Sequence, residues 1–281
     1  MPDAYGKKYE INFLTMSLPL VFKVDAIRQD SPNLKTYIFK HNIRAKSGQF
    51  LMVWMPGVDE VPMSIGWQTD TEFHVGIANA GDCTKAIHEQ IKVGDKLGFR
   101  GPYGTSFDYK DVDHIIAVGG GYGTPPMLNL AQRATELGKK VTVIQGARSA
   151  DYLLYEDLFN QLGVELMFST DDGSKGHKGY NTEVLEDYLK KADKTKKICV
   201  YTCGPEVMMV KVAKIAEEHG VDCQVSLERY MKCGFGICGQ CCMDDSGIRI
   251  CKDGPIISGK YALEHPEFGK YTRGQSGAVK E

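Results

Sequence analysis

Four cysteines near the C-terminus have a spacing that suits metal chemistry. Four residues separate Cys233 from Cys238, two separate Cys238 from Cys241, and Cys251 follows after nine more. The pattern C-x4-C-x2-C…C is typical of plant-type [2Fe–2S] clusters, in which one loop wraps its thiolates around two irons. The spacing therefore predicts a [2Fe–2S] cluster on these four cysteines, a centre that transfers single electrons.

The residues between these cysteines bear on the choice of metal. Gly234, Gly236 and Gly239 stand where a loop around a cluster must approach closely or take a positive φ. Four thiolates would also suit a structural zinc ion. Zinc sites usually use two C-x-x-C pairs, and this segment has a single one, so the cluster is the preferred interpretation. Cys242 is surplus to either site.

A glycine-rich turn lies between a predicted strand and a predicted helix, and its glycines are Gly119, Gly120, Gly121 and Gly123. Small residues in such a turn let the backbone approach a pyrophosphate, while the helix N-terminus offers free amides and a favourable dipole. The turn therefore predicts a dinucleotide site. It departs from the G-x-G-x-x-G pattern, and a tight turn without a ligand is the alternative.

Two further turns follow predicted strands, one at Arg148 and one at Cys203-Gly204-Pro205. Ligands of parallel sheets lie beyond the carboxyl ends of the strands, so we expect all three turns to line one crevice. Cys203 is the candidate catalytic residue, with a core position as its alternative. Arg148 could meet a 2′-phosphate, stack on adenine or lie at the surface, so the residues are compatible with both NAD and NADP.

The elements that must position these residues change along the chain. Short β-type runs bounded by Gly, Pro or Asp predict a small antiparallel barrel in the first third. The expected strands are Leu20–Ile27, Leu34–Phe39, Gln49–Met55, Phe73–Ala78 and Lys96–Phe99, with a helix at Thr84–Ile91.

Beyond about residue 113, strands alternate with helices, which predicts a doubly wound parallel sheet. The expected strands are Ile115–Val118, Lys140–Gln145, Val164–Ser169, Ile198–Thr202 and Cys223–Leu227. The expected helices are Pro126–Leu137, Tyr152–Leu162, Asn181–Lys190 and Glu206–His219. The last segment, 228–281, has little periodicity, and we expect a loop-rich module held together by something other than a hydrophobic core.

Composition narrows the class of protein. The 281 residues suffice for about two domains, and the net charge of −2 gives no basic tract for nucleic acid or a membrane surface. No apolar run approaches the roughly 18 residues needed to cross a bilayer, and residues 1–15 are too polar for a signal peptide. We expect a cytoplasmic protein, in which the nine cysteines are reduced thiols and not disulfides.

The barrel and these turns resemble a known superfamily. Gly101-Pro102-Tyr103-Gly104, the turn Gly119–Pro126 and Cys203-Gly204-Pro205 resemble the ferredoxin–NADP⁺ reductase superfamily. The segment Leu227–Cys242 is more specific, and it resembles the electron-transfer subunit of dihydroorotate dehydrogenase B, particularly in its archaeal versions. This resemblance runs from about Leu18 to Glu281.

The resemblance implies FAD, a [2Fe–2S] cluster and NAD as cofactors, and an FMN-containing dihydroorotate dehydrogenase of pyrimidine biosynthesis as the catalytic partner. It divides the chain into an N-terminal extension (1–17), a flavin-binding barrel (18–110), an NAD-binding α/β domain (111–227) and a cluster module with a tail (228–281). It assigns the cluster to the four cysteines and NAD to the three turns. It also implies flavin contacts at Pro62, Met63, Ser64, Gly81, Thr84, Lys85, Gly101 and Gly104.

Two of these implied contacts carry alternatives. Thr84 could hold a phosphate at a helix N-terminus, or it could simply cap that helix. The superfamily usually has Arg before Pro62, where it pairs with cofactor phosphates, and this chain has Val61. The change removes a charge-assisted contact. Lys85 is a candidate replacement, and the choice between FAD and FMN stays open on the residues alone.

Together these features predict an electron-transfer subunit that passes electrons between NAD(H), a flavin, the cluster and a partner protein. No general-base constellation is evident, since His74, His88, His114 and His177 lie in unrelated segments. Two alternatives stay open. One is the same module in a sulfide dehydrogenase, a hydrogenase or a ferredoxin–NADP⁺ transhydrogenase. The other is a zinc-bearing sensor that is not an enzyme.

Overall fold

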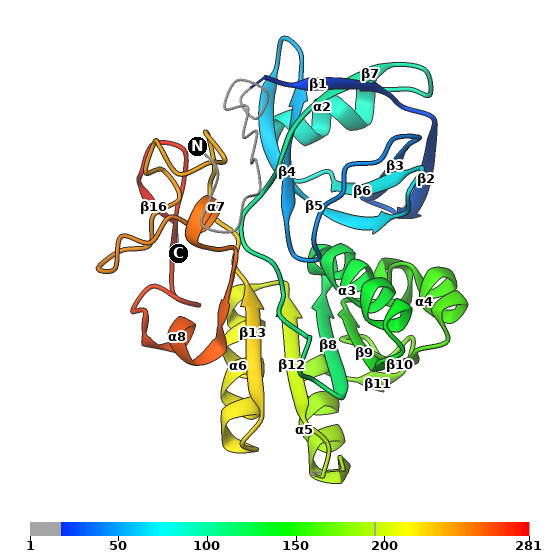
Figure 1. Ribbon diagram of the computed structural model, residues 1–281, viewed down its shortest axis with the longest axis vertical. Coiled ribbons are helices and arrows are strands. Elements are labelled where there is room, and N and C mark those ends of the chain that lie inside the picture. Colours follow the sequence, from blue (N-terminus) through cyan, green and yellow to red (C-terminus); the bar gives the residue numbers. More distant parts are fainter. Residues whose placement is uncertain (1–17, 194, 281) are drawn as a thin grey trace, which may run out of the picture.

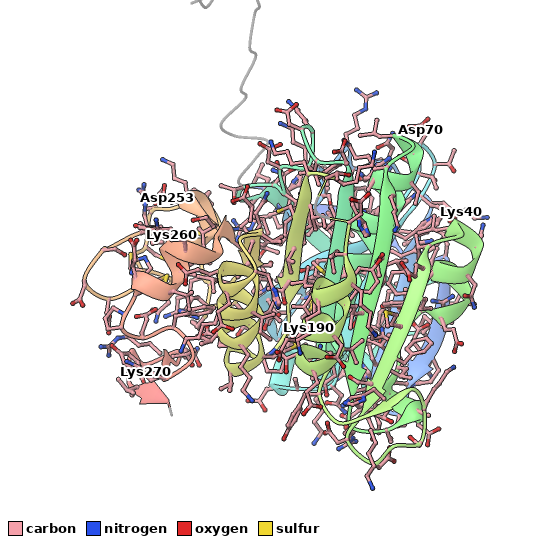
Figure 2. All side chains as sticks on the ribbon, turned by 90° about the horizontal axis from the view of Figure 1, so that it is seen from below. Lys40, Asp70, Lys190, Asp253, Lys260 and Lys270 are labelled. Carbon is pink, nitrogen blue, oxygen red and sulfur yellow. The ribbon has the colours of Figure 1, made fainter. Side chains whose placement is uncertain are left out.

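The computed structural model describes residues 18–193 and 195–280, so the predicted N-terminal extension lies outside the described residues. Figure 1 shows three parts: an antiparallel sheet (blue to cyan), a second sheet flanked by helices (green to yellow), and a C-terminal module (orange to red). Figure 2, from below, shows the module with Asp253, Lys260 and Lys270 as a lobe beside the second sheet.

The first part is a seven-stranded antiparallel half-barrel with the strand order β1-β7-β4-β5-β6-β3-β2. Its strands are β1 (Leu20–Lys23), β2 (Ala26–Ser31), β3 (Leu34–Phe39), β4 (Phe50–Met55), β5 (Asp59–Gln68), β6 (Phe73–Ala78) and β7 (Lys96–Tyr103). Only two residues join β1 to β2, yet these strands form opposite edges of the sheet, so the sheet must curve until its edges approach. The expected single strand Leu20–Ile27 is therefore two strands.

Aromatic side chains fill the interior of the half-barrel. Phe39 stacks on Phe73 with ring centroids 4.9 Å apart and meets Phe99 edge-to-face at 4.8 Å. The helix α2 (Asp82–Gln90) adds the fully buried Ile87 to the same core. Large rings of this kind bury much apolar surface and hold a small barrel together.

The second part is a sheet whose order is β11-β10-β9-β8-β12-β13-β14, with every pair parallel except the last. Its strands are β8 (His114–Gly120), β9 (Lys140–Ala147), β10 (Glu165–Thr170), β11 (His177–Lys178), β12 (Ile198–Cys203), β13 (Asp222–Ser226) and β14 (Ile256–Ser258). Between them lie α3 (Thr124–Glu136), α4 (Glu156–Leu162), α5 (Asn181–Lys191), α6 (Glu206–Glu218) and the short 3-10 turns η1 (Gly121–Gly123) and η2 (Ala150–Tyr152).

The helices cover both faces of this sheet. Ile115 and Ala117 of β8 pack in the core beneath α3, whereas Ile116 and Val118 pack with residues of α5 and α6. All four side chains are fully buried, which explains why β8 reads as a continuous apolar run and not as an alternating one. The predicted doubly wound sheet is confirmed.

One expected helix, Tyr152–Leu162, begins late because of a tertiary contact. The helix α4 starts at Glu156, and Tyr155 before it takes a left-handed φ of 60°. The buried Tyr155 hydroxyl lies 2.9 Å from Thr36 Oγ1 of the half-barrel, in space left by Gly76, where a Cβ would overlap this hydroxyl. This contact between the first two parts overrides the local helical pattern.

The C-terminal module contains α7 (Ile250–Asp253), α8 (Gly259–Glu264), β15 (Thr272–Arg273) and β16 (Val279–Lys280), and it also supplies β14 to the second sheet. The expectation that it lacks a hydrophobic core was wrong. Met243, Ile250 and Phe268 are buried against Met209 and Ala213 of α6. The module shares its core with a neighbour, so its own sequence shows no periodicity. No helix in the described ranges is long and apolar enough to cross a bilayer.

Candidate functional site

A cavity of about 230 Å³ lies where the three parts of the molecule meet. The half-barrel contributes Pro62, Met63 and Ser64 of β5 together with Thr84 of α2. The segment that leads into the cysteine loop contributes Leu227, Glu228, Arg229 and Met231. Mostly apolar walls with a few polar groups suit a flat aromatic ring that has a polar edge. The predicted flavin residues Pro62, Met63, Ser64 and Thr84 are thus brought together.

The structure shows the capping role of Thr84, while its role in holding a phosphate stays a prediction. Its Oγ1 accepts hydrogen bonds from the backbone amides of Ala80 (3.0 Å) and Gly81 (2.9 Å), and its side chain also lines the cavity. It therefore closes the N-terminus of α2 while facing the space that a flavin would take. Gly81 is the residue at which this helix is capped.

The remaining predicted flavin residues do not line this cavity. Lys85 is exposed and lies 3.9 Å from Glu89 on the same helix. Gly104 permits a close approach between the end of the half-barrel and the C-terminal module, since a Cβ there would lie 2.5 Å from Cδ of Pro255. Gly101 takes a φ of +120° near the backbone of β4. Val61 packs against the core of the half-barrel.

A second cavity of about 460 Å³ lies beyond the carboxyl ends of β8, β9, β10 and β12. Of the predicted nucleotide residues, Gly120, Gly121, Arg148 and Pro205 line it. Strands β8 and β12 are neighbours at the point where the strand order reverses, and Gly119 pairs in register with Cys203. Doubly wound sheets bind their ligands at this kind of switch point.

Glycine is required where these two strand ends approach each other. A Cβ on Gly123 would overlap the carbonyl oxygen of Cys203, and one on Gly204 would lie 2.9 Å from the carbonyl oxygen of Gly120. Gly123 and Gly204 therefore act by allowing backbone contact, whereas a Cβ on Gly119 would lie 3.1 Å from Oγ1 of Thr124. None of the three glycines lines the cavity.

The polar groups around the second cavity fit a pyrophosphate. The buried hydroxyls of Thr124, at the start of α3, and of Ser169, on the cavity wall, have no hydrogen-bond partner among the described residues. Lys211 lines the wall, and the Arg148 guanidinium lies 3.6 Å from the centre of the Tyr152 ring beside it. Cations and a helix N-terminus together favour a bound anion.

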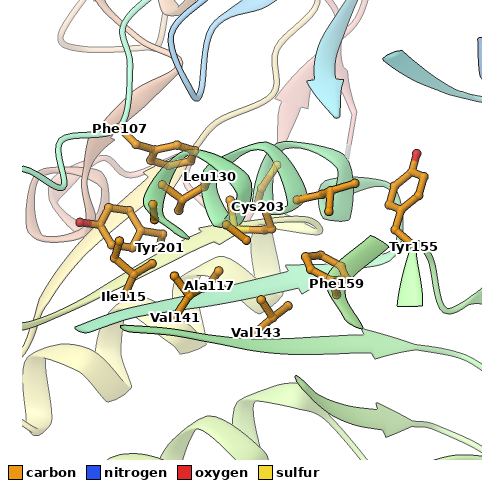
Figure 3. Packing of buried hydrophobic residues seen from close by; sticks show 14 of the residues in the cluster. Phe107, Ile115, Ala117, Leu130, Val141, Val143, Tyr155, Phe159, Tyr201 and Cys203 are labelled. Carbon is orange, nitrogen blue, oxygen red and sulfur yellow. The ribbon is translucent and has the colours of Figure 1, made fainter. Parts of the chain in front are cut away.

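Cys203 is buried in the core, and neither cavity is lined by its side chain. Figure 3 shows it among Ala117, Leu130 and their apolar neighbours. Burial raises the pKa of the Cys203 thiol, which keeps it protonated. Its catalytic role stays a prediction.

Sequence reasoning missed Tyr122 and Glu228. Tyr122 is the one described residue that lines both cavities, and its hydroxyl accepts a hydrogen bond from Nδ2 of Asn33 in the half-barrel. Its place inside the glycine turn was the available signal. Glu228 lines the 230 Å³ cavity. The available signal was its position between the last strand of the α/β domain and the cysteine loop.

The cysteine loop brings its four thiols together as two pairs. Cys233 interacts with Cys238, and Cys241 interacts with Cys251. A [2Fe–2S] cluster divides four thiolates between two irons, so this arrangement fits it. Among residues 18–193 and 195–280, no three His, Cys, Asp or Glu side chains are grouped so that they could hold a single metal ion.

Hydrogen bonds favour the ionised form of two of these thiols. Burial opposes ionisation of Cys233, but amides of Cys238, Ile237 and Phe235 outweigh it and lower its pKa to about 6. The side chain of Cys251, with its backbone amide 3.3 Å from Cys241 Sγ, lowers the pKa of Cys241 to about 7.

Glycines let the loop turn its amides inward. Gly234, Gly236 and Gly239 all have positive φ values, between +73° and +86°. Such values favour glycine over any residue with a Cβ. The donor set and the loop conformation therefore fit an iron–sulfur cluster.

Comparisons with known proteins agree with this geometry. Residues 228–261 match the model of the iron–sulfur cluster binding domain of dihydroorotate dehydrogenase B, and residues 117–214 match an oxidoreductase NAD-binding domain. Two relatives carry the name probable dihydroorotate dehydrogenase B (NAD(+)), electron transfer subunit. The one from Methanocaldococcus jannaschii is 44% identical over 93% of this chain and 98% of its own. The one from Methanothermobacter thermautotrophicus is 41% identical over 94% and 97%.

Solved structures show the same arrangement. An NADH-dependent reduced ferredoxin–NADP oxidoreductase structure matches with a TM-score of 0.76 at 26% identity, covering 86% of this chain and 89% of that one. Phthalate dioxygenase reductase matches with a TM-score of 0.61 at 17% identity over 71% and 64%. At that identity the second match concerns the fold alone.

The half-barrel, the doubly wound sheet and the cysteine loop define an iron–sulfur flavoprotein reductase of the ferredoxin–NADP⁺ reductase type. Within that class, the chain belongs to the family of dihydroorotate dehydrogenase B electron-transfer subunits. The predicted fold class, family resemblance and cofactors (FAD, a [2Fe–2S] cluster and NAD) are confirmed at the level of this family.

Proposed function

We propose that this chain is the electron-transfer subunit of an NAD-dependent dihydroorotate dehydrogenase, and that it connects NAD(H) with an FMN-containing catalytic partner of pyrimidine biosynthesis. The observation that carries the proposal is that a cavity lined by the predicted flavin residues shares Tyr122 with the nucleotide cavity and Met231 with the segment before the four cysteines. The family to which the chain belongs supplies the identity of the partner. A cytoplasmic location stays a prediction.

Each cofactor has residues suited to hold it. Pro62, Met63 and Ser64 form one wall for the flavin ring, and Thr84 faces it from the start of α2. When bound, a flavin exchanges a hydride with a nicotinamide and single electrons with an iron–sulfur cluster. The mostly apolar lining of the cavity limits the access of water to that exchange.

The second cavity offers suitable groups for the pyrophosphate and for the ribose of a nucleotide. The amides at the start of α3 and the cation of Lys211 suit its pyrophosphate. Arg148 and Asp171 line the same cavity, and an acidic group at a strand end suits the free 2′-hydroxyl of NAD. We therefore prefer NAD to NADP.

The decisive experiment is spectroscopic. Anaerobically purified protein is expected to contain FAD, two irons and two sulfides per chain, as a plant-type cluster requires. NADH should bleach its flavin band faster than NADPH, and reduction should produce the EPR signal of a [2Fe–2S] cluster. A colourless, zinc-containing protein would instead support the sensor hypothesis.

A second experiment tests the partner. Co-expression with the catalytic dihydroorotate dehydrogenase chain of the same source should yield a complex in which dihydroorotate reduces NAD⁺. The match to a ferredoxin–NADP oxidoreductase supports a second candidate, an electron-transfer subunit of that kind of complex. Binding to ferredoxin-dependent chains with no response to dihydroorotate would favour that candidate.

A further inference from the structure

Arg100, on β7 of the half-barrel, reaches out to the cysteine loop. Its Nη1 donates a hydrogen bond of 2.8 Å to the carbonyl oxygen of Cys233, and its Nη2 donates one of 3.4 Å to that of Lys232. The side chain is only 9% exposed, and it does not line the 230 Å³ cavity. Its contacts are thus directed to the backbone that presents a predicted cluster ligand.

Glu60 of β5 holds the other side of this guanidinium. Its Oε1 accepts a hydrogen bond of 2.7 Å from Nε of Arg100, and its Oε2 accepts a second from Nη2. A planar guanidinium bound at two points by a carboxylate has its orientation fixed. The hydrogen bonds with Glu60 also raise the pKa of Arg100, so the guanidinium stays charged.

Close packing surrounds the same contact. A Cβ on Gly234 would lie 2.9 Å from Cγ of Met52 and 2.9 Å from the ring of Tyr103, so the loop backbone presses directly on β4 and β7. The Phe235 ring lies beside the same strands, tilted against the ring of Tyr103 at 6.1 Å and 5.8 Å from the Arg100 guanidinium. The loop is therefore seated on the half-barrel at this point.

The contact of Arg100 with the loop lies between the 230 Å³ cavity and the thiol of Cys233, a predicted cluster ligand. Met231 lines the cavity, and Lys232 alone separates it from Cys233. Phe50 of β4 lines the cavity too, on the strand whose Met52 pairs with Arg100. Arg100 therefore holds the short stretch of backbone that connects Met231, on the cavity wall, with the predicted cluster ligand Cys233.

We propose that Arg100, oriented by Glu60, is a positioning residue that fixes Cys233 against the flavin-binding half-barrel and so sets the rate of electron transfer between flavin and cluster. The inference rests on the proposed function. Electron transfer slows steeply as donor and acceptor separate, and rates of this kind respond to ångström-scale misplacement. The pair also has an electrostatic consequence, because the charge left after removing one partner acts on the nearby cluster.

The test uses the holoprotein mixed with NADH under anaerobic conditions, with flavin bleaching and cluster reduction followed separately. R100Q should leave NADH-to-flavin reduction unchanged and slow flavin-to-cluster transfer by roughly tenfold or more. R100K keeps the charge but loses the planar guanidinium that Glu60 binds at two points. Its rate of flavin-to-cluster transfer should lie between those of R100Q and the original protein. R273Q removes an exposed partner of Asp244 within the same module, so it serves as the matched control, and both rates should stay unchanged.

Redox titration supplies an independent readout. E60Q leaves an unpaired cation beside the loop and should raise the cluster's reduction potential, whereas R100Q leaves an unpaired anion and should lower it. Equal transfer rates in R100Q and the original protein would overturn the proposal. If R100Q fails to load a cluster, E60Q provides the test instead. E60Q should slow the flavin-to-cluster transfer. An unchanged transfer rate and an unchanged cluster potential in E60Q would also overturn the proposal. Original protein without iron, sulfide or flavin would instead refute the proposed function itself.

Discussion

At the scale of single residues, the four cysteines and Tyr122 have the clearest consequences. The cysteine ligands come from one continuous loop, whereas Tyr122 connects two cavities through a hydrogen bond with Asn33, far away in the sequence. Their roles can be separated by substitution, because the cysteines are predicted to hold iron, whereas Tyr122 forms part of the wall of both cavities.

Cys242 provides a natural control for the ligand set. We expect Cys238→Ser to lose most of the iron and sulfide, because one iron would keep a single thiolate. Cys242→Ser should keep both, because Cys242 is surplus to the four spaced cysteines and interacts with Cys241 and Cys238 through charge. Iron and sulfide analysis with EPR measures the outcome, and loss of the cluster in Cys242→Ser would show that the ligand set is wrong.

Tyr122 should protect the flavin from the nucleotide side. Tyr122→Ala removes the shared wall, so we expect faster reoxidation of reduced flavin by air and weaker FAD retention, by about 1 kcal/mol for the lost aromatic contact. Tyr122→Phe keeps the ring and should change both quantities far less. Stopped-flow reoxidation and FAD content after gel filtration are the measurements. Identical behaviour of the alanine and original proteins would argue against a wall.

At the scale of elements, the turn between β8 and α3 depends on two different properties of glycine. Gly123 leaves space for the carbonyl oxygen of Cys203 on β12, whereas Gly121 has a φ of +51° with no atom within 4 Å of an added Cβ. The first property concerns packing between elements, and the second concerns backbone conformation alone.

Alanine substitutions should distinguish these two properties. Gly123→Ala must push the ends of β8 and β12 apart, which we expect to cost about 3 kcal/mol of unfolding free energy and most of the NADH affinity. Gly121→Ala should cost about 1 kcal/mol, the strain of a left-handed residue. Thermal unfolding and NADH titration check both. Similar losses in the two variants would contradict the packing argument.

At the scale of the whole molecule, buried contacts between parts hold the junction together. Arg229 lies between Glu206 of α6 and Glu267 of the C-terminal module, and its side chain is 3% exposed. Tyr155 connects the second part of the molecule to the half-barrel through Thr36. Arg100 connects the half-barrel to the cysteine loop through the carbonyl group of Cys233. Each cavity has walls from more than one part, so contacts between the parts keep those walls in place.

The ion-pair network around Arg229 should contribute strongly to stability. Glu267→Ala leaves a buried arginine short of one carboxylate, which we expect to cost about 3 kcal/mol. Asp157→Ala breaks an exposed pair with Arg28 and should cost well under 1 kcal/mol. Chemical denaturation of the two variants measures the difference. Equal costs would mean that the buried network adds nothing beyond a surface pair.

Local chemistry explains what the sequence predicted correctly and where it was wrong. The alternation of strands and helices and the cysteine spacing depend on neighbours within a few residues, and both predictions agree with the fold and the family. Helix α4 begins later than predicted because Tyr155 bonds to Thr36 of the half-barrel. The C-terminal module has a core because residues such as Phe268 pack against a distant helix, α6.

The sequence by itself determined the class of chemistry, because the ligands of an iron–sulfur loop and the glycines of a nucleotide turn are close together in the chain. Only the tertiary structure decided which side chains complete the site. Arg100 meets Cys233 across 133 positions, and Asn33 meets Tyr122 across 89. Partners so far apart leave no periodic signal, since their proximity is set by the packing of whole sheets and not by local backbone preference.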